Sequence, residues 1–203
     1  MAKLKLTKPE LKRQKAALRR FERYLPLLQL KKRQLQREVD RVRQELVDSR
    51  AKLEEASKSA EEWSGLLAED IGLKELFVLE GVEVRWENIA GMDVPMFEQA
   101  RIRVEDYDLF ALPLWVDAAV AALREIISLS AAVEVLAEQE RRFARELRLT
   151  AQRVNLFEQV KIPDARENIR RITVYLGDQQ TAAFGWALMA RRKLQAAEKG
   201  GNA

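Results

Sequence analysis

The chain has 203 residues, of which 47% are hydrophobic and 33% are charged, and its formal net charge is +4. It contains no cysteine and no histidine, which excludes disulfides, thiolate metal sites and any catalysis that depends on a thiol or an imidazole. Abundant Leu, Ala, Glu, Arg and Lys with only 5 prolines are typical of long helices. The sequence offers no signal peptide and no membrane-spanning stretch, so we expect a cytoplasmic protein.

The charges are distributed unevenly along the chain. Residues 1–50 hold 16 Lys and Arg against 6 Asp and Glu, whereas residues 54–117 hold 5 against 16. A basic first segment and an acidic middle indicate surfaces that face different partners.

Residues 4–67 follow a heptad repeat with two interleaved apolar series. A repeat of 3.5 residues sustained over this length predicts a helix in a left-handed coiled coil. Pro26 lies inside the repeat, so we expect a kink or short break near residues 22–26. The predicted seam positions on this helix are Leu11, Leu18, Leu25, Leu28, Leu35, Val39, Val42, Leu46 and Leu53.

The middle of the chain changes character. VEVRWENIA (82–90) and VPMFEQARIRV (94–104) predict two strands around the glycine-containing turn GMD, and residues 105–115 are typical of a loop. Two strands alone are marginally stable, so this hairpin has to lean on the helices or on a partner. Trp86, Met92 and Met96 are the candidate insert and partner contacts, and the methionines are better explained by hairpin packing than by a metal or redox site.

A second long helix is predicted from Leu114. Its apolar stripe includes Val160, Pro163 predicts a break, and the 3-4 spacing then resumes. The economical arrangement is an antiparallel helical hairpin that pairs residue 4 with roughly residue 195. Its seam positions are Val154, Phe157, Ile169, Ile172, Leu176 and Trp186.

These elements define the predicted fold class. It is mainly α, a long antiparallel two-helix left-handed coiled coil with a short central insert that contains a β-hairpin. We expect residues 1–72 to form the N-terminal coiled-coil helix, residues 73–113 the insert and residues 114–203 the C-terminal coiled-coil helix, together making one elongated structural unit.

No pattern in the sequence predicts a catalytic, cofactor-binding or metal site. The glycines never approach a phosphate-binding loop, and the paired carboxylates lie in the heptad region, where a solvated helix face is the simpler explanation. We therefore expect a protein that is not an enzyme. The basic first segment leaves three explanations open: a solvated face, a nucleic-acid contact, or a basic surface inside a protein cavity.

Several segments carry a family resemblance. KLTKPELKRQKAALRRFERYLPLLQLKKRQLQ (5–36) resembles the first helix of the D subunit of the V-type, also called A-type, rotary ATPases, and RVNLFEQVKIPDARENIRRITVYLGDQQ (153–180) resembles that family's C-terminal signature. ENIAGMDVP (87–95) and LPLWVD (112–117) are similar to the insert of its bacterial branch.

The resemblance implies a central rotor shaft of a rotary ATPase or ATP synthase, which carries torque between the catalytic hexamer and a membrane ring that moves protons or sodium. The implied partners are the catalytic A and noncatalytic B subunits, the F subunit and the socket subunit of the ring, with no nucleic acid and no direct membrane span. The chain would be peripheral to the cell membrane, without a cofactor. The implied hexamer-cavity contacts form a basic tip: Lys5, Lys8, Lys12, Arg13, Lys15, Arg19, Arg20, Arg191, Arg192 and Lys193.

The alternative is a free-standing coiled-coil adaptor or a basic nucleic-acid-binding helical hairpin.

Overall fold

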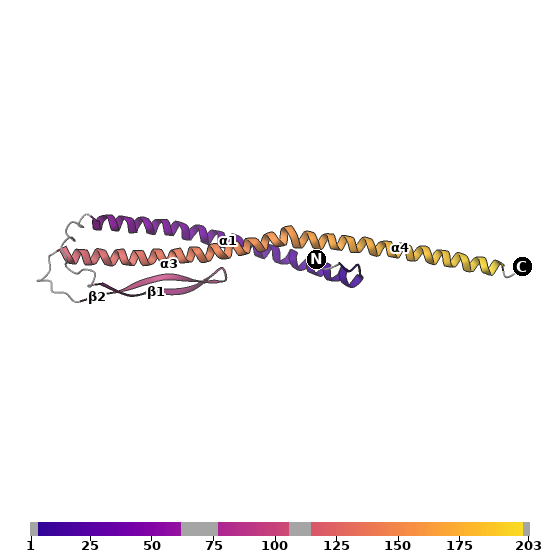
Figure 1. Ribbon diagram of the computed structural model, residues 1–203, viewed down its shortest axis with the longest axis horizontal. Helices are drawn as coiled ribbons and strands as arrows, with labels where there is room; N and C mark the ends of the chain where they lie inside the picture. The colour runs from indigo at the N-terminus through magenta and orange to yellow at the C-terminus, as the bar shows by residue number, and fades with distance from the viewer. Residues whose placement is uncertain (1–3, 62–76, 106–114, 201–203) are drawn as a thin grey trace. The chain divides into compact units, whose positions relative to one another are not determined.

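The computed structural model describes residues 4–61, 77–105 and 115–200 (Figure 1). The elements in chain order are helix α1 (Lys8–Glu61), strands β1 (Phe77–Ile89) and β2 (Met92–Val104), helix α3 (Trp115–Leu156), π-helical turn η2 (Phe157–Lys161) and helix α4 (Ile162–Gly200). The prediction of a mainly α chain with a central antiparallel hairpin is confirmed. The predicted boundaries at residues 72 and 113 lie outside the described residues.

The chain divides into two units, and each is described by itself. The central unit is Lys31–Thr150, and the terminal unit combines Met1–Leu30 with Ala151–Ala203. The first boundary falls inside α1 and the second inside α3.

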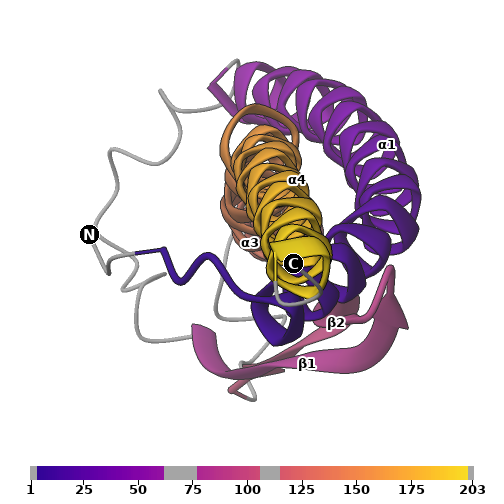
Figure 2. The ribbon, with the colours of Figure 1, turned by 90° about the vertical axis from the view of Figure 1, so that its right-hand side faces the viewer.

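The core of the central unit joins both helices to the hairpin. Leu35, Val39 and Val42 of α1 pack with Val94 of β2 and Phe143 of α3, and all five side chains are at most 1% exposed. The spacing of the three α1 residues is the heptad spacing, so the predicted seam face is the face that packs here. In both ribbon views the hairpin lies along one side of α3 (Figures 1 and 2).

The hairpin turn is made by Ala90 and Gly91. Both have positive φ, 54° and 76°, as a two-residue turn of type I′ requires, and the strands pair in antiparallel register from Ile89 opposite Met92 to Phe77 opposite Val104. The register shifts twice, between Leu79 and Gly81 and between Glu83 and Val84. Such bulges increase the local twist of a ribbon. The predicted hairpin is confirmed, with β1 longer than expected at its start.

The terminal unit pairs the first part of α1 with the end of α3, η2 and the first half of α4. The rings of Phe21 and Phe157 lie 5.3 Å apart, and Arg166 forms a 2.9 Å ion pair with Glu22. Near the start of the chain, Leu4 lines a groove together with residues 170–178.

The predicted pairing of residue 4 with roughly residue 195 is therefore wrong. A heptad pattern fixes which face of a helix is apolar, but it matches a partner equally well after a slip by whole heptads.

The prolines do not end the helices. α1 continues through Pro26, which rules out the short break of the predicted kink or break, and Leu25 and Leu28 stay half-buried on either side of the proline. Before Pro163 the helix widens into the π turn, in which the Ile162 N–H bonds the Phe157 carbonyl. This wider turn suits a proline, because its ring clashes with the carbonyl four residues earlier in a regular α-helix.

The π turn also resets the seam. The buried and half-buried positions 150, 154 and 157 are three or four residues apart. The next position, 162, comes five residues later, and the spacing of three or four residues resumes at 165, 169 and 172. The step of five keeps Ile162 and Ile172 on the packed face. It leaves Val160, which the sequence placed in the apolar stripe, 43% exposed.

Candidate partner-binding surfaces

The tip of the hairpin is fixed to α3 by two polar side chains. The buried Gln139 donates from Nε2 to the Pro95 carbonyl at 2.6 Å, and the same nitrogen lies 3.4 Å from the Met96 sulfur. Arg142 donates to the Asp93 carbonyl at 3.4 Å. Because both partners are main-chain carbonyls of β2, these bonds set the position of the strand itself.

Two of the three residues predicted to contact a partner from the hairpin instead make contacts within the chain. Met92 packs against the central core, and Met96 lies beside Gln139. Trp86 is 55% exposed, although the Arg142 guanidinium lies 5.0 Å from the centre of its ring. A cation over a tryptophan face is attractive, so the ring is held in place while much of it stays accessible to a partner.

The remainder of the hairpin exposes apolar and charged side chains together. Val78, Leu79 and Val82 of β1 are each more than a third exposed. On the same ribbon Glu83 pairs with Arg101, and a hydrogen bond from Gln99 is the main cause that lowers the pKa of the Glu83 carboxyl. The hairpin is thus a mixed surface of the kind that protein partners cover.

The basic residues near the start of α1 are exposed. This holds for Lys5, Lys8, Lys12, Arg13, Lys15, Arg19 and Arg20. Arg13 is also bound to the buried Glu10 at 3.0 Å, and the hydrogen bond from Gln14, with that of Arg13, lowers the pKa of the Glu10 carboxyl. The remaining cations of this group form the exposed basic face of the terminal unit.

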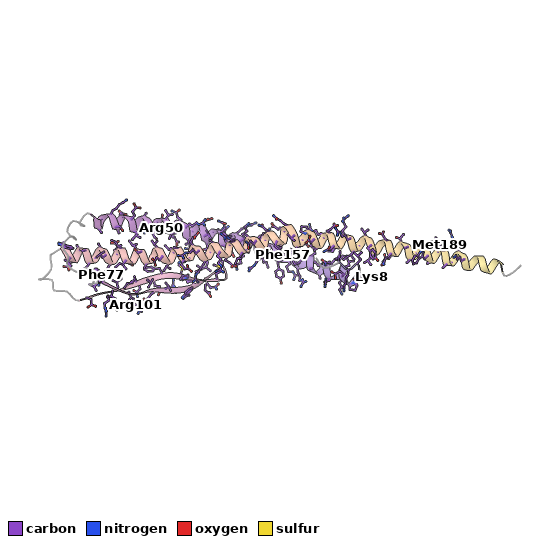
Figure 3. The ribbon with its side chains drawn as sticks, viewed as in Figure 1. Lys8, Arg50, Phe77, Arg101, Phe157 and Met189 are labelled. Atoms are coloured by element: carbon purple, nitrogen blue, oxygen red, sulfur yellow. The ribbon has the colours of Figure 1, made fainter. Side chains whose placement is uncertain are left out.

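The second basic group, Arg191, Arg192 and Lys193, is exposed as well, but it lies elsewhere along α4. Asp178 is the last α4 residue in the groove with Leu4, and Arg191 follows about 20 Å further on at a rise of 1.5 Å per residue. Figure 3 shows Met189 on the stretch of α4 beyond Lys8. The two groups that the sequence combined into one basic tip are therefore separated within the terminal unit.

The far part of α4 carries large apolar side chains that are in water in this chain. Phe184 is 68% exposed, Trp186 75% and Met189 65%. Trp186 does not fit its predicted place in the seam, since the register brings residues 4–6 beside residues 170–178, before that tryptophan is reached. Sequence reasoning missed Phe184 and Met189. A run of apolar residues without a heptad, AAFGWALMA, is the signal that could have found them.

The other predicted seam residues differ in burial. Five are buried: Leu35, Val39, Val42, Val154 and Ile172. Nine are half-buried: Leu11, Leu18, Leu25, Leu28, Leu46, Leu53, Phe157, Ile169 and Leu176.

Within the described ranges, no group of three or more acidic side chains is placed to hold a metal ion. None of the described helices is long and apolar enough to cross a membrane. A hollow lies between the start of α1 and α4, and charged side chains such as Arg13, Glu167 and Arg171 line it.

The geometry defines a helical coiled-coil protein with a β-hairpin on one side and exposed apolar and basic helix surfaces. A model of the family described as the D subunit of ATP synthase matches residues 10–192. The chain belongs to this family.

The sequences of related proteins align with nearly the whole of this chain. The V-type ATP synthase D subunit of Borreliella burgdorferi is 38% identical over 96% of both chains. Those of Chlamydia caviae and Chlamydia abortus are 36% and 34% identical over 96% of this chain and 95% of theirs.

Proposed function

We propose that this chain is the central rotor shaft of a V-type ATPase or ATP synthase, without a catalytic site of its own. It lies in the cytoplasm at the membrane periphery and carries torque between the catalytic A and B hexamer and the socket subunit of an ion-translocating ring, with the F subunit bound beside it. The family membership and the names of the relatives support this role.

The observation that carries the proposal is the exposed stretch of α4 from residue 179 to residue 193. It presents Phe184, Trp186 and Met189 to water, and its only charged residues are the basic ones at its end. An apolar helix that its own chain leaves uncovered is suited to insertion into the cavity of a larger assembly.

The basic residues have a role in this proposal that does not require one compact tip. Cations spaced along the terminal unit give long-range attraction to an acidic wall, with little dependence on angle. A shaft that turns in a bearing needs such attraction, because contacts specific to one angle resist rotation.

The hairpin is proposed as the contact for a second class of partner. Its tip is fixed to α3 by Gln139 and Arg142, so force applied to the exposed ring of Trp86 passes to α3. We assign this surface to the F subunit or the socket subunit.

The test is co-expression with the A, B and F subunits of the same genome, followed by gel filtration and an ATPase assay with and without this chain. A complex with one copy per hexamer, whose turnover depends on the chain, is the expected result. A chain that ends after Asp178 is expected to keep the F subunit and to lose coupling of turnover to the shaft.

The matched control exchanges Arg50, which is exposed on α1 in the central unit, for alanine. Failure of the complete chain to join the complex contradicts the proposal. Salt-sensitive binding of nucleic acid by the isolated chain favours the alternative of a basic helical hairpin.

A further inference from the structure

The end of α4 carries an apolar surface on more than one side. Phe184, Trp186, Leu188 and Met189 are all more than 40% exposed. At 3.6 residues per turn these four side chains point in different directions around the helix axis. Surfaces of this kind are covered when a suitable partner is present.

Two residues of opposite charge lie at equal distances along the sequence before and after Gly185. Counted from Gly185, Asp178 lies seven residues before and Arg192 seven residues after. If two copies of α4 pair in antiparallel directions about Gly185, Asp178 of each copy lies opposite Arg192 of the other. A two-fold axis makes the same favourable pair twice.

The same antiparallel pairing explains why residue 185 is a glycine. A Cβ atom added at Gly185 meets nothing within 4 Å in this chain, so the packing of the chain itself does not require glycine. Glycine inside a helix lowers helix stability relative to alanine. At the crossing point of two helices it permits close approach of the backbones, and the exposed Leu188 and Met189, about one turn after Gly185, lie on the same side of the helix as this glycine.

We propose that the isolated chain forms an antiparallel dimer through residues 178–192 of α4, centred on Gly185. The dimer does not depend on the proposed function. If that function is correct, the dimer occupies one side of the stretch that enters the hexamer, and the two states exclude each other.

Sedimentation of the full-length chain over a range of concentrations tests the proposal with two charge reversals. Asp178→Arg and Arg192→Asp each turn both symmetric pairs into like-charge pairs, and each variant alone is expected to dimerise at least about tenfold more weakly. An equal mixture of the two variants restores both opposite-charge pairs. The mixture is therefore expected to form a heterodimer close to the strength of the unmodified dimer.

Arg50→Asp, an equal charge reversal on the exposed face of α1, is the control and leaves the dimer unchanged. Circular dichroism checks that each variant keeps its helical content. A chain that is monomeric at all concentrations overturns the proposal. So does a dimer that the single reversals leave intact, or one that the mixture fails to restore.

A pair of glycine variants gives an independent test. Gly177 and Gly185 both have free space where a Cβ would lie, so alanine at either is expected to raise helical stability. Only Gly185→Ala is expected to weaken the dimer, because Gly177 lies far from the proposed crossing point. Equal dimerisation by both variants contradicts the crossing at Gly185.

Discussion

The two units use the same heptad pattern but bury very different amounts of it. In the central unit the helices and the hairpin enclose a cluster of five apolar side chains at 1% exposure or less, and Val116 is equally buried. The described part of the terminal unit contains helices and no strand, and Ile172 is its only described apolar side chain that reaches this level of burial. In the central unit the hairpin covers the side of the core that two helices alone leave exposed.

A helix seam alone therefore does not make a closed core. Two paired helices shield one stripe of each other, and the flanks stay in water. The central unit is therefore expected to be the stable part of the chain, and the terminal unit to depend more on whatever covers it.

Replacing one phenylalanine in each unit tests whether the two units differ in stability. Phe143→Ala removes a fully buried ring of the central core and is expected to cost about 3–5 kcal/mol. Phe157→Ala removes a half-buried ring whose described aromatic neighbour is Phe21, and is expected to cost about 1–2 kcal/mol. Urea unfolding followed by circular dichroism measures both, and equal losses contradict the contrast.

A second test addresses the seam of the terminal unit. Deleting Asn168 rotates Ile172 by about 100° out of its buried position and is expected to cost about 2–4 kcal/mol. Deleting Val160 together with Pro163→Ala instead turns the π turn into a regular α-helical turn and keeps Ile172 in place, with an expected cost below about 1.5 kcal/mol. Thermal unfolding compares the two, and a larger loss from the second change shows that the π turn does more than set the register.

Much of the fold follows from local patterns in the sequence. The heptad residues Leu35, Val39 and Val42 identify the packed face of α1, and the glycine turn identifies the hairpin, because both signals depend on residues close together in the chain. The register between the helices is different. Its error of several turns arises because every heptad slip gives a similar seam, and only contacts such as Phe21 with Phe157 select one.

The surfaces are predicted less well than the fold. The exposed cations of α1 are evident from charge alone, whereas their separation from Arg191 follows from the register and was predicted wrongly. The bonds of Gln139 to the hairpin have no local signal, since nothing near residue 139 indicates that the Pro95 carbonyl lies beside it. Long-range polar contacts of this kind require the folded chain.

A third test separates the hairpin from the helices of the central unit. Gln139→Ala leaves the Pro95 carbonyl without its donor and is expected to cost about 1–3 kcal/mol. Hydrogen exchange is expected to quicken in β1 and β2 and to stay unchanged in the terminal unit. Arg141→Ala, at an exposed neighbouring position, is the control, and equal changes from both variants contradict the role of Gln139.

The smallest expected effect concerns the pKa values of two carboxylates, one in each unit. Hydrogen bonds from Arg170 first, and then Arg171, lower the pKa of Glu167 from 4.5 to about 2, and a hydrogen bond from Arg142 lowers that of Glu138. A lowered pKa means that the folded chain binds the proton less readily than the unfolded chain. The contribution of Glu167 to stability is therefore complete above pH 4.5 and is lost as the pH falls towards 2.

Carboxyl chemical shifts measured by NMR give both titration midpoints. Arg170→Gln is expected to raise the midpoint of Glu167 and to leave that of Glu138 unchanged, because the two carboxylates have different arginine partners. Glu167 is accessible to solvent, so added salt reduces the shift. A Glu167 midpoint that stays near 4.5 in the unmodified chain means that its arginine pairs do not persist in solution. Ion pairs would then order the first part of α4 less than packing orders the central unit.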